Sequence, residues 1–594
     1  MKKIQEYIVK SILTAVSILC LSAITGCGDF LEVESQNITT EEKFWNEKSD
    51  VENVIASCYS AMQSYAVLSR MMIWGEFRSE NIVANGNISN LDSDLERILK
   101  ENITASNSYT YYGDFYYIIN QCNLIIAKAP EVAAKDPSYA KSELSAHIAE
   151  VTAIRSLCYF YLIRTFEKVP YSEEVFTSDD QTLALPAETF SVILKKLIAS
   201  LEEVKSLAVK KYPVSIERNK LSDNYQTARI TRMAIYAMLC EMYLWDKDYD
   251  NCIKYADLII EQKKEDAKEY IEENMSSLDF SDFNGYPLIG ARYSASNYFG
   301  YAFTNIFVDG NSIESILELT FVKESGSSMP SNAPTSNFFG NLGRNAFCKA
   351  SDYIATDITK ETPVVYNNKY DGRAYENFRF ANNSAIGINK YACAYPSSVV
   401  LGDPNSNSFF SGGNWGTMYE TEGVDYESRN KSNFIIYRLS DIMLLKAEAL
   451  AQKITNDASI STPEDMDLRN RAFDLVTAIN KRSLYQTALK DTLLVTNYAS
   501  KDKIVELVAA ERERELMFEG KRYFDLVRRA QRDGDTKYLR GKAKLKSSEN
   551  ASVIESKLTR NEAMYWPYNL DEMKANKFLV QNPAFGSGEN ESWE

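Results

Sequence analysis

The sequence predicts a mainly α-helical protein, in which paired helices form a scaffold and one loop-rich insert carries short strands. Apolar residues recur at helical spacing along most of the 594-residue chain. Helix pairs of similar size also follow one another in order, as in helical repeats. Between residues 282 and 430 the periodicity fails, and Gly, Ser, Asn and aromatic residues dominate. We therefore expect a signal segment at 1–26, helical regions at 27–281 and 431–594, and the insert at 282–430.

The first 26 residues are predicted to be a lipoprotein signal. Lys2, Lys3 and Lys10 precede an apolar run at 12–23, which is shorter than the about 20 residues of a membrane span. Small residues then stand before Cys27, as in a lipobox. Cleavage there would let Cys27 carry several acyl chains, such as palmitate, and several chains anchor a protein stably. The alternative is an ordinary secretory signal with a coincidental cysteine.

Charge and composition exclude several classes of function. The formal net charge of −16 argues against nucleic-acid binding, which needs clustered Lys and Arg. The single histidine, His147, and the absence of any CxxC pair argue against a zinc site, and no cofactor is expected. His147 lies in a helical pattern with no placed nucleophile, so a structural role is favoured. The nine cysteines are predicted to be mostly buried free thiols, except Cys20 in the signal and the lipidated Cys27.

The N-terminal half is predicted to contain helices joined by polar loops. The first helix would span 39–65, with Thr40 as its N-cap, and a polar, turn-rich loop would follow at 71–90. The next helices are predicted at 112–128, 142–166 and 186–207, with a proline-bounded connection at 130–137 between the first two.

Residues 229–245 and 249–261 resemble a tetratricopeptide repeat most clearly. Large and small residues alternate at the expected positions of both helices: Tyr236, Leu239, Cys240, Tyr243, Tyr249 and Cys252. The small residues should let the helices approach closely while the aromatic rings fill the space between them. A second pair is expected at 440–452 and 471–482.

The segment 510–529 should close the series as two helices that meet at Gly520, the left-handed residue after the first helix. Glu511, Glu515 and Glu519 recur at helical spacing among arginines and aromatic residues. We expect a half-buried, structural seam of ion pairs rather than a catalytic acid–base group.

The insert at 282–430 is predicted to be a ligand-facing surface with short strands, such as one at 315–322. Disordered segments are poor in aromatic residues, and this segment is rich in them. Long loops on a rigid scaffold are a common location for binding residues.

Several motifs, in this order, resemble those of the SusD/RagB family. The similar residues are the lipidated start at Cys27 and Gly28; Tyr112, Phe115, Tyr116, Ile119, Cys122 and Asn123; Ala149, Glu150, Arg155, Tyr159 and Phe160; Arg438, Asp441, Ala447, Glu448 and Ala449; Glu511, Arg512, Glu515, Phe518, Glu519, Gly520 and Asp525; and Trp566, Pro567, Glu572, Asn576 and Asn582. Tyr112 replaces the family's usual Trp, and Asn569 stands where a second proline is frequent, which indicates a looser turn.

The resemblance implies a non-catalytic, outer-membrane, surface-exposed lipoprotein that captures nutrient for a partner TonB-dependent transporter (SusC-like). A sugar ring offers apolar faces between hydroxyl groups, so aromatic side chains with a few polar partners suit it. The ligand-binding candidates are Trp415 first, then Tyr298, Phe299, Tyr301, Phe409, Phe410 and Tyr419, with Trp74 on the predicted N-terminal loop. Two alternatives remain at this point: the same scaffold could capture peptides, or the protein could be a surface glycosidase with two carboxylates across a cleft.

Overall fold

The computed structural model describes residues 44–86, 88–177, 184–212, 226–274, 283–290, 301–321, 332–340, 346–355, 364–366, 371–381, 384–391, 394–396, 415–417, 432–484 and 493–586. Most of these residues lie in α-helices, which confirms the predicted fold class.

The N-terminal helices pack around α7 (Lys141–Phe166), which is buried at every residue from Ala149 to Phe166. The other helices here are α3 (Lys48–Met62), α4 (Tyr65–Met72), α5 (Ser93–Leu99), α6 (Gly113–Lys135) and α8 (Phe190–Val204). Helix α6 lies against both α3 and α7, and α8 lies against α7. The proline-bounded connection predicted at 130–137 is wrong in its first part, because α6 continues through Pro130 to Lys135 with Ala129 and Val132 in the core. Thr40, the predicted N-cap, lies outside the described residues.

The polar loop predicted at 71–90 is also wrong in its first part. Helix α4 continues directly into a π-helical turn, η1 (Ile73–Phe77), and residues 67–82 are buried throughout. Three charged residues that follow α4, Glu76, Arg78 and Glu80, are buried with partners from the C-terminal half. Since polar residues occupy buried positions here, the stretch lacks the apolar stripe by which a helix is predicted.

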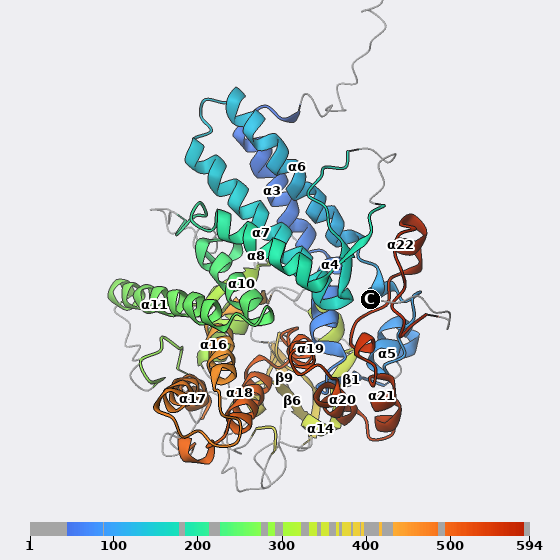
Figure 1. The fold of residues 1–594 in the computed structure, drawn as a ribbon, viewed down its shortest axis with the longest axis vertical. Coiled ribbons are helices and arrows are strands. Elements are labelled where there is room, and N and C mark those ends of the chain that lie inside the picture. Colours follow the sequence, from blue (N-terminus) through green and yellow to red (C-terminus); the bar gives the residue numbers. More distant parts are fainter. Residues whose placement is uncertain are drawn as a thin grey trace, which may run out of the picture.

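The predicted helix pairs are present. Helix α10 (Arg232–Trp245) packs on α11 (Tyr249–Asn274), and α16 (Leu439–Lys453) packs on α17 (Pro463–Ser483). The segment 510–529 begins within α18 (Lys501–Leu516) and ends within α19 (Arg522–Asp533). Helix α16 contacts α10, α11, α17 and α18, and so joins the two halves of the chain. The C-terminal part ends with α20 (Lys537–Ala543), α21 (Ala551–Lys557) and α22 (Leu570–Ala575). The N-terminal helices α3, α6 and α7 stand in the upper part of the view, and α17, α18, α20 and α21 of the C-terminal part stand in the lower part, with the N-terminal α5 beside α20 and α21 (Figure 1).

The sheets of the described residues are antiparallel pairs of short strands. The pair of β4 (Ser315–Leu319) with β10 (Phe434–Arg438) confirms the strand predicted from residue 315. The pair of β1 (Ile82–Ala84) with β5 (Cys348–Ala350) joins the insert to the N-terminal half. The remaining pairs are β2 (Lys168–Pro170) with β3 (Ala187–Thr189), β6 (Phe378–Ala381) with β7 (Ser384–Ile388), and β8 (Ala394–Pro396) with β9 (Trp415–Thr417). The insert is thus paired to both halves of the scaffold.

Short helices complete the described part of the insert: α12 (Tyr301–Phe303), the π-helical η5 (Thr304–Asp309), α13 (Ala333–Phe339), α14 (Asp352–Ala355) and α15 (Arg373–Glu376). One large hydrophobic core runs from the N-terminal helices through this region to the C-terminal tail. A smaller core lies between α11, α16, α17 and α18. The described part of the insert therefore shares its hydrophobic core with the helical scaffold.

Candidate functional site

The segment 510–529 forms a cluster of buried ion pairs, which we call the charged junction: Glu511, Glu515 and Glu519 with the basic groups that contact them. Glu515 is its centre. Its carboxylate accepts hydrogen bonds from Arg373 Nη1 at 2.9 Å, from Arg438 Nη1 at 2.5 Å and from Arg482. These three guanidinium groups hold the pKa of Glu515 well below its usual range, although burial acts in the opposite direction.

Glu519 and Glu511 extend the junction on either side. Arg438 binds Glu519 with two hydrogen bonds of 2.7 and 2.9 Å, and Lys390 Nζ donates to the same carboxylate at 2.6 Å. Arg373 Nη1 also donates to Glu511 at 2.7 Å. Arg373 belongs to α15 and Lys390 follows β7, so both come from the insert. The junction therefore ties the insert to the C-terminal helices.

The N-terminal half reaches the junction through Glu76 of η1. Its carboxylate accepts hydrogen bonds from the backbone N–H groups of Phe518 at 3.1 Å, and of Lys521 and Arg522 at 3.2 Å each. Two of these groups lie at the start of α19, where N–H groups have no partner within the helix and a carboxylate is favourable. Burial nevertheless raises the pKa of Glu76 to about 7. Glu76 thus provides the cap that α19 lacks in its own sequence.

The backbones of η1 and the junction touch at two glycines. A Cβ atom on Gly75 would lie 1.8 Å from the carbonyl oxygen of Gly520, so no other residue fits there. Gly520 has a φ of +73°, as expected, but it does not follow α18 directly. Helix α18 ends at Leu516, and Phe518 takes the left-handed conformation after it with a φ of +68°. The prediction that Gly520 is the C′ residue was wrong, because the helix stops one turn earlier.

The junction is buried more deeply than the predicted half-buried seam. Glu511, Glu515 and Glu519 are each at most 3% exposed. Pairing with arginine or lysine holds the pKa of all three carboxylates below the usual range against the effect of burial, and burial keeps them away from any substrate. Their arrangement suits a structural role rather than proton transfer.

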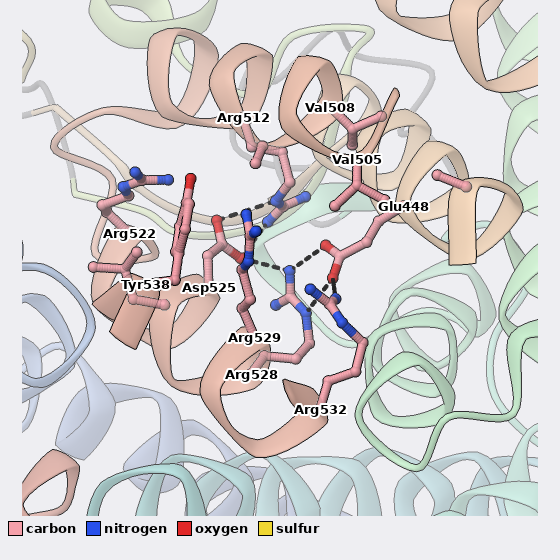
Figure 2. Close-up of a pocket in the computed structure, with 13 residues that line it drawn as sticks. Glu448, Val505, Val508, Arg512, Arg522, Asp525, Arg528, Arg529, Arg532 and Tyr538 are labelled. Atoms are coloured by element: carbon pink, nitrogen blue, oxygen red, sulfur yellow. Dashed lines mark hydrogen bonds and ion pairs between the residues drawn. The ribbon is translucent and has the colours of Figure 1, made fainter. Parts of the chain in front are cut away.

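Two small cavities lie in this part of the molecule, and only the first is lined by residues of the junction. One lies under the insert between Phe303, Phe307, Lys390 and Glu515, and the other lies among the arginines of α18 and α19. In the second, Asp525 joins Arg512 to Arg528, and Glu448 joins Arg528 to Arg532 (Figure 2). Each has a free volume of about 30 Å³, which is room for one or two water molecules. Neither can hold a sugar ring.

Most of the predicted ligand-binding aromatics lie outside the described residues: Tyr298, Phe299, Phe409, Phe410 and Tyr419. The backbone of Trp415 opens β9, opposite Pro396 of β8, and Tyr301 is the first residue of α12. For this set, ligand contact remains a prediction.

Trp74 requires a correction, because it is part of the core. Its side chain is fully buried, its ring stacks on Phe115 with 4.9 Å between centroids, and its Nε1 donates to the carbonyl of Tyr109 at 2.9 Å. The prediction assumed an exposed loop, whereas Trp74 lies in η1. Trp74 therefore packs in the core of the scaffold, and its side chain has no exposed face to offer a ligand.

His147 is buried in α7, where its Nδ1 shares a hydrogen bond of 2.8 Å with the Tyr139 hydroxyl. Burial lowers the pKa of His147, which favours the neutral ring and fits a structural role. Within the described stretches, no group of three or more His, Cys, Asp or Glu side chains could hold a metal ion. No helix in the described part of the chain is long and apolar enough to cross a membrane.

Comparisons with known proteins agree on one family. The profile of the SusD family matches residues 290–585. The SusD-like protein P38 of Formosa agariphila is 25% identical over 530 residues, which cover 87% of this chain and 90% of that protein. A SusD superfamily protein from Bacteroides vulgatus has a similar structure, with a TM-score of 0.62 and 16% identity over 91% of this chain and all of that one. A laminarin-binding SusD-like protein gives a TM-score of 0.57 and 16% identity with the same coverage.

Proposed function

Because the chain belongs to the SusD/RagB family, we propose that it is a non-catalytic glycan-binding lipoprotein of the cell surface. It captures oligosaccharides and passes them to a SusC-like, TonB-dependent transporter of the outer membrane. The lipobox before Cys27 supports anchoring by lipid. The similarity to a laminarin-binding protein supports a glycan as the ligand.

One structural observation carries the proposal: the base of the aromatic-rich insert is fixed to the scaffold. Arg373 and Lys390 of the insert make buried ion pairs with Glu511, Glu515 and Glu519. Strands β4 and β5 also pair with strands outside the insert. A fixed base allows loops to present aromatic side chains in one arrangement, which lowers the entropic cost of binding.

The test uses the full-length lipoprotein, purified in detergent. Laminarin, starch and other polysaccharides are cast separately into native gels, and reducing ends are measured in parallel. We expect one class of polysaccharide to retard the protein without release of reducing ends. Release of reducing ends would contradict the proposal and favour a glycosidase. Selective co-purification of peptides, with no retardation by any polysaccharide, would favour peptide capture instead.

The anchoring part of the proposal has its own test. Cys27→Ser removes the thiol that would carry lipid, so this variant should leave the membrane fraction. Cys20→Ser, within the signal, is the control and should remain in the membrane. If the Cys27 variant stays in the membrane fraction, the lipobox interpretation is wrong.

A further inference from the structure

Two cysteines face each other inside the α10–α11 helix pair. Cys240 lies in the last turns of α10 and Cys252 in the first turn of α11. Their Sγ atoms are 3.7 Å apart, and both side chains are fully buried. Cys252 Sγ also lies 3.9 Å from the carbonyl oxygen of Leu445, a weak contact. The two thiols are therefore closer to each other than to any strong hydrogen-bond acceptor.

The packing of this helix pair keeps the two sulfur atoms together. Tyr243 stacks on Tyr255 with 5.8 Å between ring centroids, and Tyr236 packs against the same ring. The aromatic rings fill the space on one side, and the two small residues allow the helices to approach closely. A disulfide needs a sulfur separation of about 2 Å, so the two sulfur atoms must approach each other by less than about 2 Å to form the bond.

We propose that Cys240 and Cys252 form a disulfide that links α10 to α11 when the protein is exported. Disulfides form and persist in oxidising compartments, so the bond is expected only if the protein is exported as proposed above. The geometry of the pair does not depend on that location. The bond would make the helix pair a covalent hairpin closed across a short loop.

The reaction is thiol–disulfide exchange with an exported oxidoreductase that carries a reactive disulfide. The thiolate of one cysteine attacks that disulfide and forms a mixed disulfide, and the first thiol of the oxidoreductase leaves. The second cysteine then attacks the mixed sulfur and releases the second thiol. Two protons and two electrons pass from the cysteine pair to the oxidoreductase, which is reduced to a dithiol.

The bond must form before the helices close. Both thiols are inaccessible in the fold, and burial raises the pKa of Cys240 well above its ordinary value, so little thiolate is available for attack. A chain that folds reduced should therefore stay reduced. The oxidation state records the conditions under which the chain folded.

The primary test maps the cysteines of the full-length protein isolated from its host membrane. The protein is denatured with an alkylating agent, digested with trypsin without reduction, and analysed by mass spectrometry. Trypsin cuts after Arg232, Lys247 and Lys254, so the two cysteines fall on separate peptides. We expect a linked pair of these peptides that separates on reduction. Complete alkylation of both cysteines would overturn the proposal. Cys348, which is buried and has no such partner in the described residues, should be alkylated and serves as the internal control.

A second experiment tests the geometry apart from the cellular compartment. The purified chain is unfolded, reduced, and refolded either with oxidised glutathione or with a reductant. Refolding with oxidised glutathione should produce the linked peptides and raise the melting temperature, and adding reductant after folding should not reverse the effect quickly.

Cys252→Ala should melt at the same temperature after refolding in either buffer, whereas Cys348→Ala should keep the difference in melting temperature between the two buffers. Equal melting temperatures for the unmodified chain, with no linked peptides, would show that the pair cannot close. The membrane fractionation of the Cys27 variant tests the lipid anchor by itself. A failure of the proposed anchoring can therefore be distinguished from a failure of the proposed disulfide.

Discussion

The charged junction and the aromatic-rich insert both contain many polar residues, but they differ in how their conformation is fixed. In the junction each of the three carboxylates has arginine or lysine partners, and the backbone at Gly520 leaves no room for a Cβ atom on Gly75. In the insert, the described residues are fixed where they reach the junction or pair with outside strands. The difference separates two roles: the junction determines where the insert lies, and under the proposed function the loops of the insert contact the ligand.

Buried ion pairs suit the first role better than an apolar contact would. Replacing a buried ion pair by well-packed apolar side chains is often neutral for stability, so stability alone does not explain the junction. Hydrogen bonds to a guanidinium are directional, and Arg438 satisfies Glu515 and Glu519 together in only one arrangement. The comparison therefore predicts that changes in the junction lower stability and changes in the loops of the insert lower affinity.

The largest loss of stability is expected for Gly75→Ala. The new methyl group would lie 1.8 Å from the carbonyl oxygen of Gly520 and 2.5 Å from its carbonyl carbon, and both are backbone atoms that cannot rotate away as a side chain could. We expect a loss of about 4 kcal/mol or more in the free energy of unfolding, measured by chemical denaturation.

Gly541→Ala in α20 is the matched control, because nothing lies within 4 Å of a Cβ atom there. A helical Gly→Ala change in open space should stabilise by about 0.5–1 kcal/mol. Similar stabilities for the two variants would show that η1 and the junction do not touch as described.

The next effect is expected for Glu515→Ala. Removal of this carboxylate leaves Arg373, Arg438 and Arg482 without a shared buried partner. Breaking a buried pair on one side costs about 3–5 kcal/mol. Glu506→Ala on the same helix removes a carboxylate that is half-exposed and paired with Arg529, so it should cost about 0–1 kcal/mol. Equal losses would mean that the junction behaves like a surface ion pair.

The sequence predicted the helical pairs well and the centre of the junction only in part. Helix α7 and the α10–α11 pair contain long runs rich in apolar and aromatic residues, and they pack mainly on helices that are close to them in the chain. The partners of Glu515 come from α15, β10 and α17, up to 142 residues away in the chain. No local pattern in one sequence connects them. The long-range pairing of Lys390 with Glu519 could not be predicted for the same reason.

The stretch 73–82 could have been predicted better than it was. Glu76, Arg78 and Glu80 alternate with apolar and small residues and follow the apolar end of α4. That alternation beside Trp74 and Phe77 is unusual for an exposed loop, since large aromatic side chains are seldom left in water. The sequence pattern still predicts a polar loop, because buried charges with distant partners look the same in a sequence as exposed ones.

A smaller effect, visible as a pH dependence, is expected from Glu76. Its pKa is about 7 in the folded protein, above its ordinary value of 4.5, so the folded state binds a proton more tightly than the unfolded chain does. Its contribution to stability is therefore complete below pH 4.5 and is lost as pH rises to about 7, by about 3 kcal/mol in total.

Glu76→Gln tests this prediction because glutamine does not titrate. Melting curves of both proteins between pH 4.5 and 8 should show the unmodified protein losing its advantage over the variant as pH rises to about 7. A difference that is constant with pH, or that grows in favour of the unmodified protein, would show that the hydrogen bonds from Phe518, Lys521 and Arg522 outweigh burial and keep Glu76 ionised.

The smallest effect on stability and the largest on affinity are expected for Trp415→Ala, which depends on the proposed glycan binding. An aromatic contact to a sugar ring is worth about 1–1.5 kcal/mol, so the dissociation constant should rise about tenfold while the melting temperature stays nearly unchanged. Trp74→Phe is the opposite control: it removes the buried hydrogen bond to Tyr109 and should lower stability without changing affinity. If Trp415→Ala instead lowers the melting temperature and leaves binding intact, Trp415 belongs to the packing beneath the insert. That result would contradict the expectation that changes in the loops of the insert lower affinity rather than stability.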